Sequence, residues 1–160
     1  MNELRDPRHR VSPRARVMWF VSSAVTSVVL VAAVTLATTL WLTGWWTWPA
    51  IALSLVWAVV DVLMVPQWRY LVHRWEATDT AVYTQRGWWS RERRIAPMSR
   101  VQTVDFTQGP LARLLGLATV TVTTASAAGP LQIDGLEADV ALHLVDDLTR
   151  KADLVEGDAT

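Results

Sequence analysis

The strongest constraint on this chain is a stretch of about 44 residues, positions 17–60, that contains no Asp, Glu, Lys or Arg. One membrane span needs about 20 apolar residues, so the stretch is long enough for two. A Gly, a Pro and three Trp residues lie together at positions 43–49, which favours a turn at the headgroup level. The sequence therefore predicts a transmembrane helical hairpin over residues 17–70, with spans at about 17–42 and 49–69. A cleaved signal peptide would have a shorter apolar core, of about 7–15 residues, and no second apolar run.

Basic residues flank both ends of the predicted hairpin. The N-terminal arm, residues 1–16, holds five Arg residues, and Arg69 and Arg74 lie at the end of the second span. The positive-inside rule places such flanks in the cytoplasm, so we expect both termini and the C-terminal domain there. We expect the arm to be irregular, since it contains two Pro residues. Its Arg residues either fix the topology alone or also bind anionic headgroups.

Asp61 is an acidic residue inside the second span. It lies roughly 18 Å along the helix from Pro49, in the inner half of the bilayer. A carboxylate there is destabilising unless it is neutralised, hydrated or paired. Two interpretations follow: a protonated or water-reaching side chain, or a polar contact to the first helix or to a partner subunit. Pro66 is expected to kink or end the helix.

After residue 70 the pattern changes to short alternating strands and a final amphipathic helix. The sequence predicts a domain over residues 71–154 with a helix at 137–154 and a tail at 155–160. A short helical turn between glycines is expected at 109–116. The fold class is α+β, a mainly antiparallel barrel or sandwich closed by the C-terminal helix. The expected strands are 71–78, 81–86, 92–97, 101–108, 119–124 and 131–136.

Composition excludes several classes of function. The chain has no Cys, which excludes disulfides and thiolate metal sites, and His9, His73 and His143 lack the spacing of metal ligands. From residue 76 onward there are twelve acidic and eight basic residues, a balance that argues against nucleic-acid binding. No catalytic motif is present. We therefore expect no enzyme activity, no cofactor and no small-molecule substrate.

Three polar residues on or beside the predicted strands are candidate contacts: Arg100, Gln102 and Arg113. They are either structural, with Arg100 paired to Asp105 or another carboxylate, or they form a partner-binding edge.

A second candidate contact is a predicted hairpin tip with two adjacent Trp residues, Trp88 and Trp89, between Arg86 and Arg91. Exposed Trp side chains suggest that the tip enters the inner headgroups or contacts a second protein.

Two stretches resemble a known family. Residues 93–104 read Arg-Arg-Ile-Ala-Pro-Met-Ser-Arg-Val-Gln-Thr-Val, and residues 108–122 begin Gln-Gly-Pro-Leu-Ala-Arg-Leu-Leu-Gly-Leu. With the hairpin, and with the Ile-Asp-Gly-Leu of residues 133–136, they resemble the YdbS-like bacterial membrane proteins, which carry a bacterial pleckstrin-homology-like domain. Where the family pattern has Ile-Pro, this chain has Ile-Ala-Pro, with one residue inserted.

The resemblance implies a pleckstrin-homology-like domain anchored at the cytoplasmic face of a bacterial membrane, and it implies no reaction. Phosphoinositide binding is not implied, because the turn at residues 78–80 has no basic cluster. We predict a non-enzymatic interaction module in the lipid bilayer, a subunit or adaptor for a membrane protein partner or for a second copy of itself. The alternative is a sensor of anionic headgroups that uses the arm at residues 5–16, Arg86 and Arg91.

Overall fold

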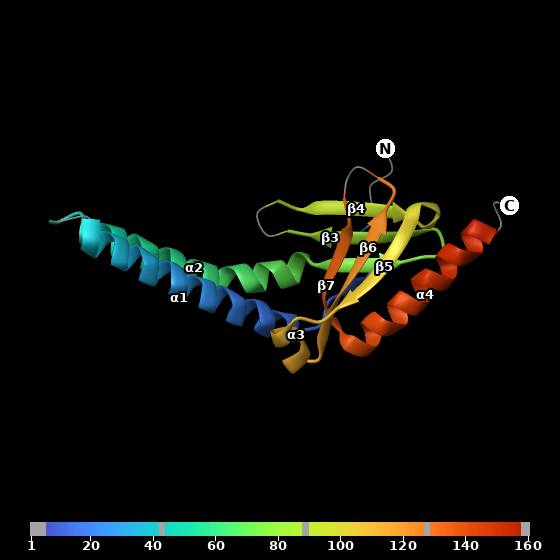
Figure 1. Ribbon diagram of the computed structural model, residues 1–160, viewed down its shortest axis with the longest axis horizontal. Helices are drawn as coiled ribbons and strands as arrows, with labels where there is room; N and C mark the ends of the chain where they lie inside the picture. The colour runs from blue at the N-terminus through green and yellow to red at the C-terminus, as the bar shows by residue number, and fades with distance from the viewer. Residues whose placement is uncertain (1–5, 42–43, 88–89, 127–128, 158–160) are drawn as a thin grey trace.

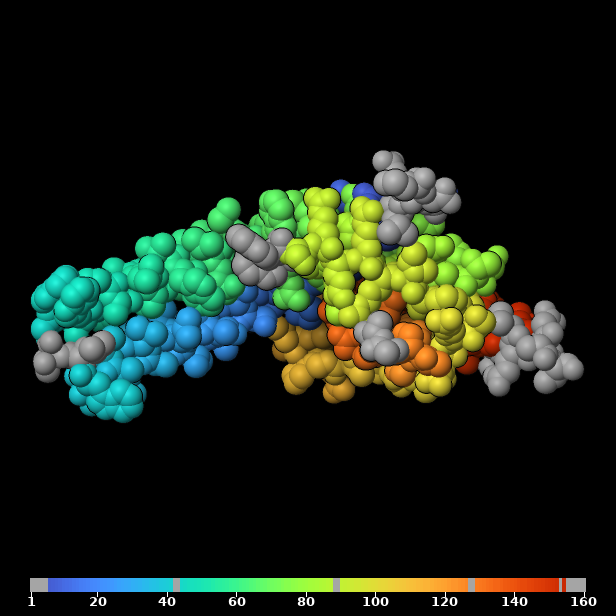
Figure 2. All heavy atoms as spheres, turned by 90° about the horizontal axis from the view of Figure 1, so that it is seen from above, coloured from blue at the N-terminus to red at the C-terminus, as the bar shows by residue number. Residues whose placement is uncertain are grey.

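The computed structural model describes residues 6–41, 44–87, 90–126 and 129–157. The molecule is elongated, with two long helices projecting from a compact domain of strands (Figures 1 and 2). The helices α1 (Ala15–Trp41) and α2 (Thr47–Val72) pack against each other along their length. The predicted hairpin of two apolar helices is confirmed.

Both helices are long and apolar enough to span a membrane. In each, only 11% of the most apolar window is buried, so their apolar side chains face outward, unlike those of a core helix. At 1.5 Å per residue each helix is about 40 Å long, which exceeds the roughly 30 Å hydrocarbon layer. Part of each helix therefore extends beyond the bilayer. Pro66 does not end α2, which continues to Val72.

Within the described residues, seven antiparallel strands form two sheets. In the first the order is β1-β2-β3-β4, and in the second it is β5-β6-β7. The predicted sandwich with a C-terminal helix is confirmed, and the two sheets do not close into a barrel. The strands are β1 (His9–Arg10), β2 (Arg74–Ala77), β3 (Ala81–Arg86), β4 (Glu92–Pro97), β5 (Val101–Thr107), β6 (Leu117–Thr124) and β7 (Leu131–Glu137).

Three helical segments complete the domain: η1 (Met98–Arg100), α3 (Pro110–Leu114) and α4 (Ala138–Gly157). α4 packs across the second sheet (Figure 1) and covers the core. Its apolar stripe buries Ala141, Leu144 and Leu148 against side chains from both sheets, among them Val82 and Val120. One hydrophobic cluster therefore joins the two sheets and the helix.

Several predicted bounds, and the predicted conformation of the N-terminal arm, differ from the structure. The first domain strand was expected from residue 71, but it begins at Arg74 because α2 runs to Val72 and only His73 intervenes. α4 extends three residues beyond the predicted end at 154. The N-terminal arm is not irregular throughout, since His9 and Arg10 pair with Trp75 and Arg74 of β2.

The hairpin is inserted into the domain at the first turns of α1. Ala15 and Trp19 are almost fully buried against Leu117, in a second apolar cluster. Gly135 makes this contact possible: its φ is +75°, and a Cβ placed there would lie 2.6 Å from the Cβ of Ala15. The Ser12 N–H donates a hydrogen bond to the Gly135 carbonyl, at 2.9 Å. Hairpin and domain are thus packed together and not joined by a linker.

Candidate functional site

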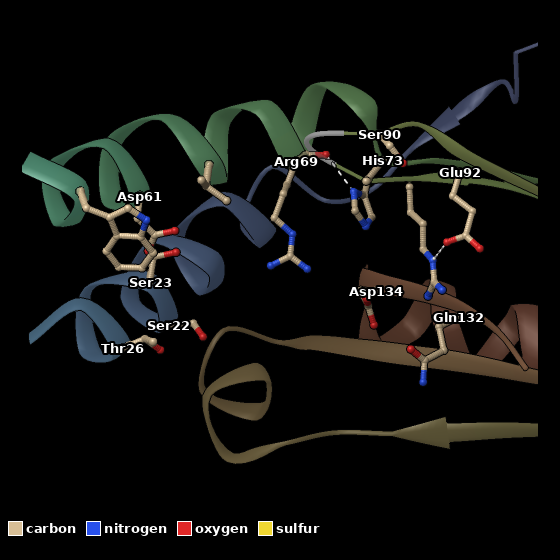
Figure 3. Close-up of a pocket in the computed structure, with 14 residues that line it drawn as sticks. Ser22, Ser23, Thr26, Asp61, Arg69, His73, Ser90, Glu92, Gln132 and Asp134 are labelled. Carbon is tan, nitrogen blue, oxygen red and sulfur yellow. Dashed lines mark hydrogen bonds and ion pairs between the residues drawn. The ribbon is translucent and has the colours of Figure 1, made fainter. Parts of the chain in front are cut away.

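A polar cavity of about 620 Å³ lies where the hairpin meets the domain (Figure 3). Side chains from both helices form one side of it, and residues of β3, β4 and β7 form the other. The cavity is therefore built from two parts of the chain that are far apart in sequence. It forms where the hairpin, packed into the sandwich at the start of α1, lies beside the strands.

The hairpin side of the cavity follows from helical spacing. Trp57, Asp61, Val65 and Arg69 line the cavity at intervals of four residues, which places them on one face of α2. Three hydroxyl side chains face them from α1, those of Ser22, Ser23 and Thr26. A hairpin that is otherwise apolar thus carries a polar stripe on the side that faces the cavity.

Asp61 contacts the first helix. The Ser27 hydroxyl donates a hydrogen bond to Oδ2 of Asp61, at 3.3 Å. The carboxylate also lines the cavity, so one side chain makes the interhelical contact and lies beside a polar space. The structure thus shows the contact to the first helix, and the position of Asp61 beside the cavity is also compatible with a side chain that reaches water.

Arg69 is the cation that the hairpin contributes to the cavity. In Figure 3 its guanidinium lies in the gap between Asp61 on the hairpin and Asp134 on β7. The group stacks over the ring of Trp19 at 5.0 Å, a cation–π contact that fixes its position. Among the residues that the structure describes, no carboxylate lies within 4.0 Å of Arg69 to form an ion pair.

His73 lies beside Arg69 and is buried. Its Nδ1 is 2.9 Å from the backbone carbonyl of Arg69, so Nδ1 carries the proton and donates. Burial lowers the pKa of His73, and the positive charges of Arg69 and Arg86 act in the same direction. The ring is therefore neutral at pH 7, and its Nε2 is a hydrogen-bond acceptor on the cavity side (Figure 3).

The domain side of the cavity carries the ion pair between Arg86 and Glu92 and the carboxylate of Asp134. Nε of Arg86 donates to Oε2 of Glu92 at 2.9 Å, and Arg94 binds the other oxygen of Glu92 at 2.6 Å. These hydrogen bonds lower the pKa of Glu92, so the carboxylate stays ionised and neutralises Arg86. Asp134 accepts a hydrogen bond from the Thr119 hydroxyl at 3.1 Å and lines the cavity with its neighbour Gln132.

The structure brings two of the predicted site residues together and separates the others. Arg86 and Asp61 line the junction cavity. Arg91 lies outside it, at a smaller pocket beside Asp6 and Trp68. Trp88 and Trp89 fall outside the described residues.

The remaining candidates lie on the domain at two distant places. Arg100 and Gln102 are exposed at the start of β5, whereas Arg113 is exposed on α3, at the opposite end of that strand. Gln102 is the extra residue of a β-bulge between Val101 and Thr103. The predicted pairing of Arg100 with Asp105 is not found; the Thr103 hydroxyl, at 3.4 Å, contacts Asp105 instead.

Sequence reasoning missed the central members of the site, Arg69, His73 and Asp134. Position in the sequence indicates only a basic flank for Arg69, and His73 does not share metal-ligand spacing with His9 or His143. The usable signal was the four-residue spacing of Trp57, Asp61, Val65 and Arg69. No sequence pattern linked that stripe to Asp134, which is 65 positions beyond Arg69.

Comparison with known proteins places the chain in a family. A family model described as "Bacterial PH domain" matches residues 16–152, and thus covers the hairpin as well as the sandwich. The UPF0699 transmembrane protein YdbS of Bacillus subtilis (strain 168) is 32% identical over 156 residues, which are 95% of this chain and 97% of that protein. No solved structure matches. Neither match indicates an enzyme family. This chain is a membrane protein that belongs to the bacterial pleckstrin-homology (PH) domain family and is similar to YdbS-like proteins.

Proposed function

We propose that the protein is a non-enzymatic module anchored in the bacterial membrane, which binds a polar lipid headgroup of the cytoplasmic leaflet. The observation that carries this proposal is the polar cavity at the junction, lined by both the hairpin and the domain. A headgroup bound there would touch residues of both parts. The domain would then respond to the lipid that surrounds its own anchor.

The depth of the cavity supports a lipid as the ligand. Trp48 and Trp68 of α2 are 75% and 51% exposed, and their separation of twenty positions corresponds to about 30 Å of helix, which matches the hydrocarbon thickness. Trp side chains prefer the two interfaces of the bilayer. Arg69 follows Trp68 directly, so its guanidinium lies at headgroup level. Asp61, eight residues before Arg69, lies roughly 12 Å deeper.

The composition of the cavity also supports a lipid. The shallow part carries Arg69, His73 and the charged residues of the domain. Further in, Trp57 and Val65 add apolar surface to the hairpin side, beside Asp61 and the hydroxyl groups of α1. A phospholipid would place its phosphate at the charged end and the start of its acyl chains against the two apolar side chains.

Retention of lipid tests the proposal. Full-length protein is purified in a mild detergent, and the phospholipid that copurifies is measured by mass spectrometry. Thr26→Trp fills the α1 side of the cavity and should lower the bound phospholipid severalfold. Ala33→Trp is the matched control, because it adds the same ring to an exposed position on the same helix outside the cavity. Equal retention by both variants would contradict the proposal.

A role as an adaptor or subunit for a membrane protein partner is the second candidate function. It is favoured by Arg100, which is exposed and forms no ion pair with any residue in the described ranges. β5 is an edge strand, and the bulge at Gln102 turns a side chain outward next to that guanidinium. A carboxylate on a partner protein, or on a second copy of this chain, would complete the pair.

Crosslinking in native membranes, followed by mass spectrometry, tests the adaptor role. The paired substitution Arg100→Ala with Gln102→Ala should abolish recovery of a stoichiometric partner. Arg150→Ala on α4 serves as a control, because it removes an exposed Arg elsewhere on the domain. Recovery of the same partner from all variants would exclude this edge as the contact.

A further inference from the structure

The charges that line the junction cavity do not suit a purely anionic ligand. Within the described residues the lining includes two Arg side chains and three carboxylates, and one of the Arg side chains, Arg86, is already paired with Glu92. What remains is one guanidinium, Arg69, which lies between the carboxylates of Asp61 and Asp134 (Figure 3). A ligand with a negative charge alone would meet these two carboxylates as well as the guanidinium.

We infer that the cavity binds a zwitterionic headgroup in which a phosphodiester is joined to a primary ammonium, the ethanolamine class of phospholipid. The inference rests on the proposed function and names its ligand. It differs from the anionic-headgroup sensor predicted from sequence in both the charge of the ligand and the residues used.

The phosphate is assigned to the hairpin side of the cavity. A guanidinium forms strong, charge-assisted hydrogen bonds to phosphate oxygens. Arg69 is held over Trp19 and has no protein carboxylate within 4.0 Å among the described residues, so its donors are free to bind. The hydroxyl groups of Ser22 and Ser23 on α1 face the same space and supply further donors (Figure 3).

The ammonium is assigned to the domain side. Asp134 offers a carboxylate, and the Nε2 of His73 offers a lone pair because Nδ1 is already the donor to the Arg69 carbonyl. Gln132, two residues before Asp134, adds an amide oxygen. A primary ammonium has three N–H donors, which is the number of these acceptors. A trimethylammonium group has no donor and would leave the acceptors unsatisfied.

The order of these groups across the cavity matches the headgroup. In Figure 3 the guanidinium of Arg69 lies between the hydroxyl side chains of α1 and the pair formed by His73 and Asp134. A ligand whose phosphate and ammonium are separated by two carbons can bind Arg69 with one end and Asp134 with the other. The glycerol and acyl chains would then leave along α2 toward Val65 and Trp57, which is the direction of the bilayer interior.

The test compares three phospholipids with identical acyl chains. Full-length, delipidated protein in detergent is titrated with phosphatidylethanolamine, phosphatidylcholine and phosphatidylglycerol, and the bound fraction is measured by native mass spectrometry. We expect phosphatidylethanolamine to bind roughly tenfold more tightly than either of the others, since one charge-assisted contact is gained. Equal or tighter binding of phosphatidylglycerol would overturn the inference.

Two variants assign the ends of the ligand. Asp134→Asn is isosteric and keeps the oxygen that accepts from Thr119, so the sandwich should fold normally. Asp134→Asn should abolish the preference for ethanolamine over choline, whereas Arg69→Gln should weaken the binding of all three lipids. Asp105→Asn, on the exposed face of β5, is the control and should change nothing. An unchanged preference in Asp134→Asn would overturn the assignment of the ammonium.

The outcomes separate this inference from the proposed function. Suppose that Arg69→Gln binds none of the lipids and that the native protein shows no headgroup preference. The headgroup site would then stand, and the ethanolamine class would be rejected. If neither Arg69→Gln nor Thr26→Trp changes lipid binding, both the headgroup site and the ethanolamine class are rejected. A competition experiment with glycerophosphoethanolamine, which has the same headgroup but no acyl chains, tests whether the ligand is a membrane lipid or a soluble molecule. If this compound displaces the lipid at equal concentration, the ligand is a soluble molecule and the membrane lipid is rejected.

Discussion

Gly135 is required for two separate reasons, its backbone conformation and its close contact with Ala15. A φ of +75° disfavours any residue with a Cβ, and the α1 side chain of Ala15 occupies the place that a Cβ would take. Gly135→Ala should therefore lower the free energy of unfolding by about 1–3 kcal/mol, since α1 must move away from β7. Thermal unfolding of the purified protein measures the loss.

Gly129 offers a matched control for the substitution at Gly135. Its φ is +76°, nearly the same, but nothing lies within 4 Å of a Cβ built there. Gly129→Ala therefore carries only the backbone strain. If both variants lose the same stability, the contact with Ala15 contributes nothing, and the packing of the hairpin into the domain would have to be explained otherwise.

His73 should make the stability of the protein depend on pH. Its folded-state pKa lies below the ordinary value of 6.5 because the ring is buried. Below pH 6.5 the unfolded chain therefore binds a proton that the folded chain does not, and stability falls with falling pH until the folded-state pKa is reached. We expect the melting temperature to be lower at about pH 5.5 than at about pH 7.5.

The pH effect can be assigned to His73 by substitution. His73→Gln should flatten the difference between the two pH values, whereas His143→Gln, an exposed position on α4, should leave it unchanged. Since carboxylates with a lowered pKa, such as Glu92, remain ionised in this range, they do not contribute to the difference. A difference that survives in His73→Gln would show that another group titrates.

Single residues were the hardest feature to predict from sequence. The cost of burying a carboxylate in a span singled out Asp61 but left open whether it reaches water or makes a polar contact, and the structure adds a hydrogen bond from Ser27. Arg69 could not be distinguished from other basic residues that flank a span. Its role depends on the position of β7, and tertiary packing alone brings that strand to it.

β1 is the smallest element, and its backbone pairing with β2 can be tested directly. Its two residues cover the edge of β2, and the ion pair between Arg8 and Glu76 lies beside them, at 3.5 Å. The double substitution His9→Pro with Arg10→Pro removes the N–H donors and should lower the free energy of unfolding by on the order of 1–2 kcal/mol. Hydrogen exchange of the β2 amides should become faster.

The matched control is His9→Ala with Arg10→Ala, which removes the same side chains but keeps both N–H groups. It should leave the exchange of β2 close to that of the native protein. If the Pro and Ala variants exchange equally fast, backbone pairing by β1 does not protect β2.

Elements with a local periodic pattern were predictable, and those without one were not. Two long apolar runs predicted α1 and α2, and alternation predicted strands such as β6, because these signals lie within each segment. β1 has only two residues, too few to show alternation, and its arm contains Pro residues that favour irregular structure. Pairing with β2, 65 positions away in sequence, determines its conformation.

For the whole molecule, the direct connection between anchor and domain is the feature with most consequence. α2 ends at Val72 and β2 begins at Arg74, while the start of α1 is buried against β7 and Leu117. The site at the junction needs this arrangement, because Arg69 and Asp134 belong to the two different parts. A flexible linker at the same place would leave each part folded but would separate the two ends of the ligand site.

Insertion of Gly-Gly-Ser between Val72 and His73 would create such a linker. The helices and the sandwich should still form, since each has its own apolar contacts, but phospholipid retention should fall to the level of Thr26→Trp. The same insertion after Gly44, in the turn at the far end of the hairpin, is the control and should retain lipid normally. Normal retention by the Val72 insertion would mean that the hairpin alone binds the headgroup. The domain would then make no contribution to the site, and the assignment of the ammonium to Asp134 would fail with it.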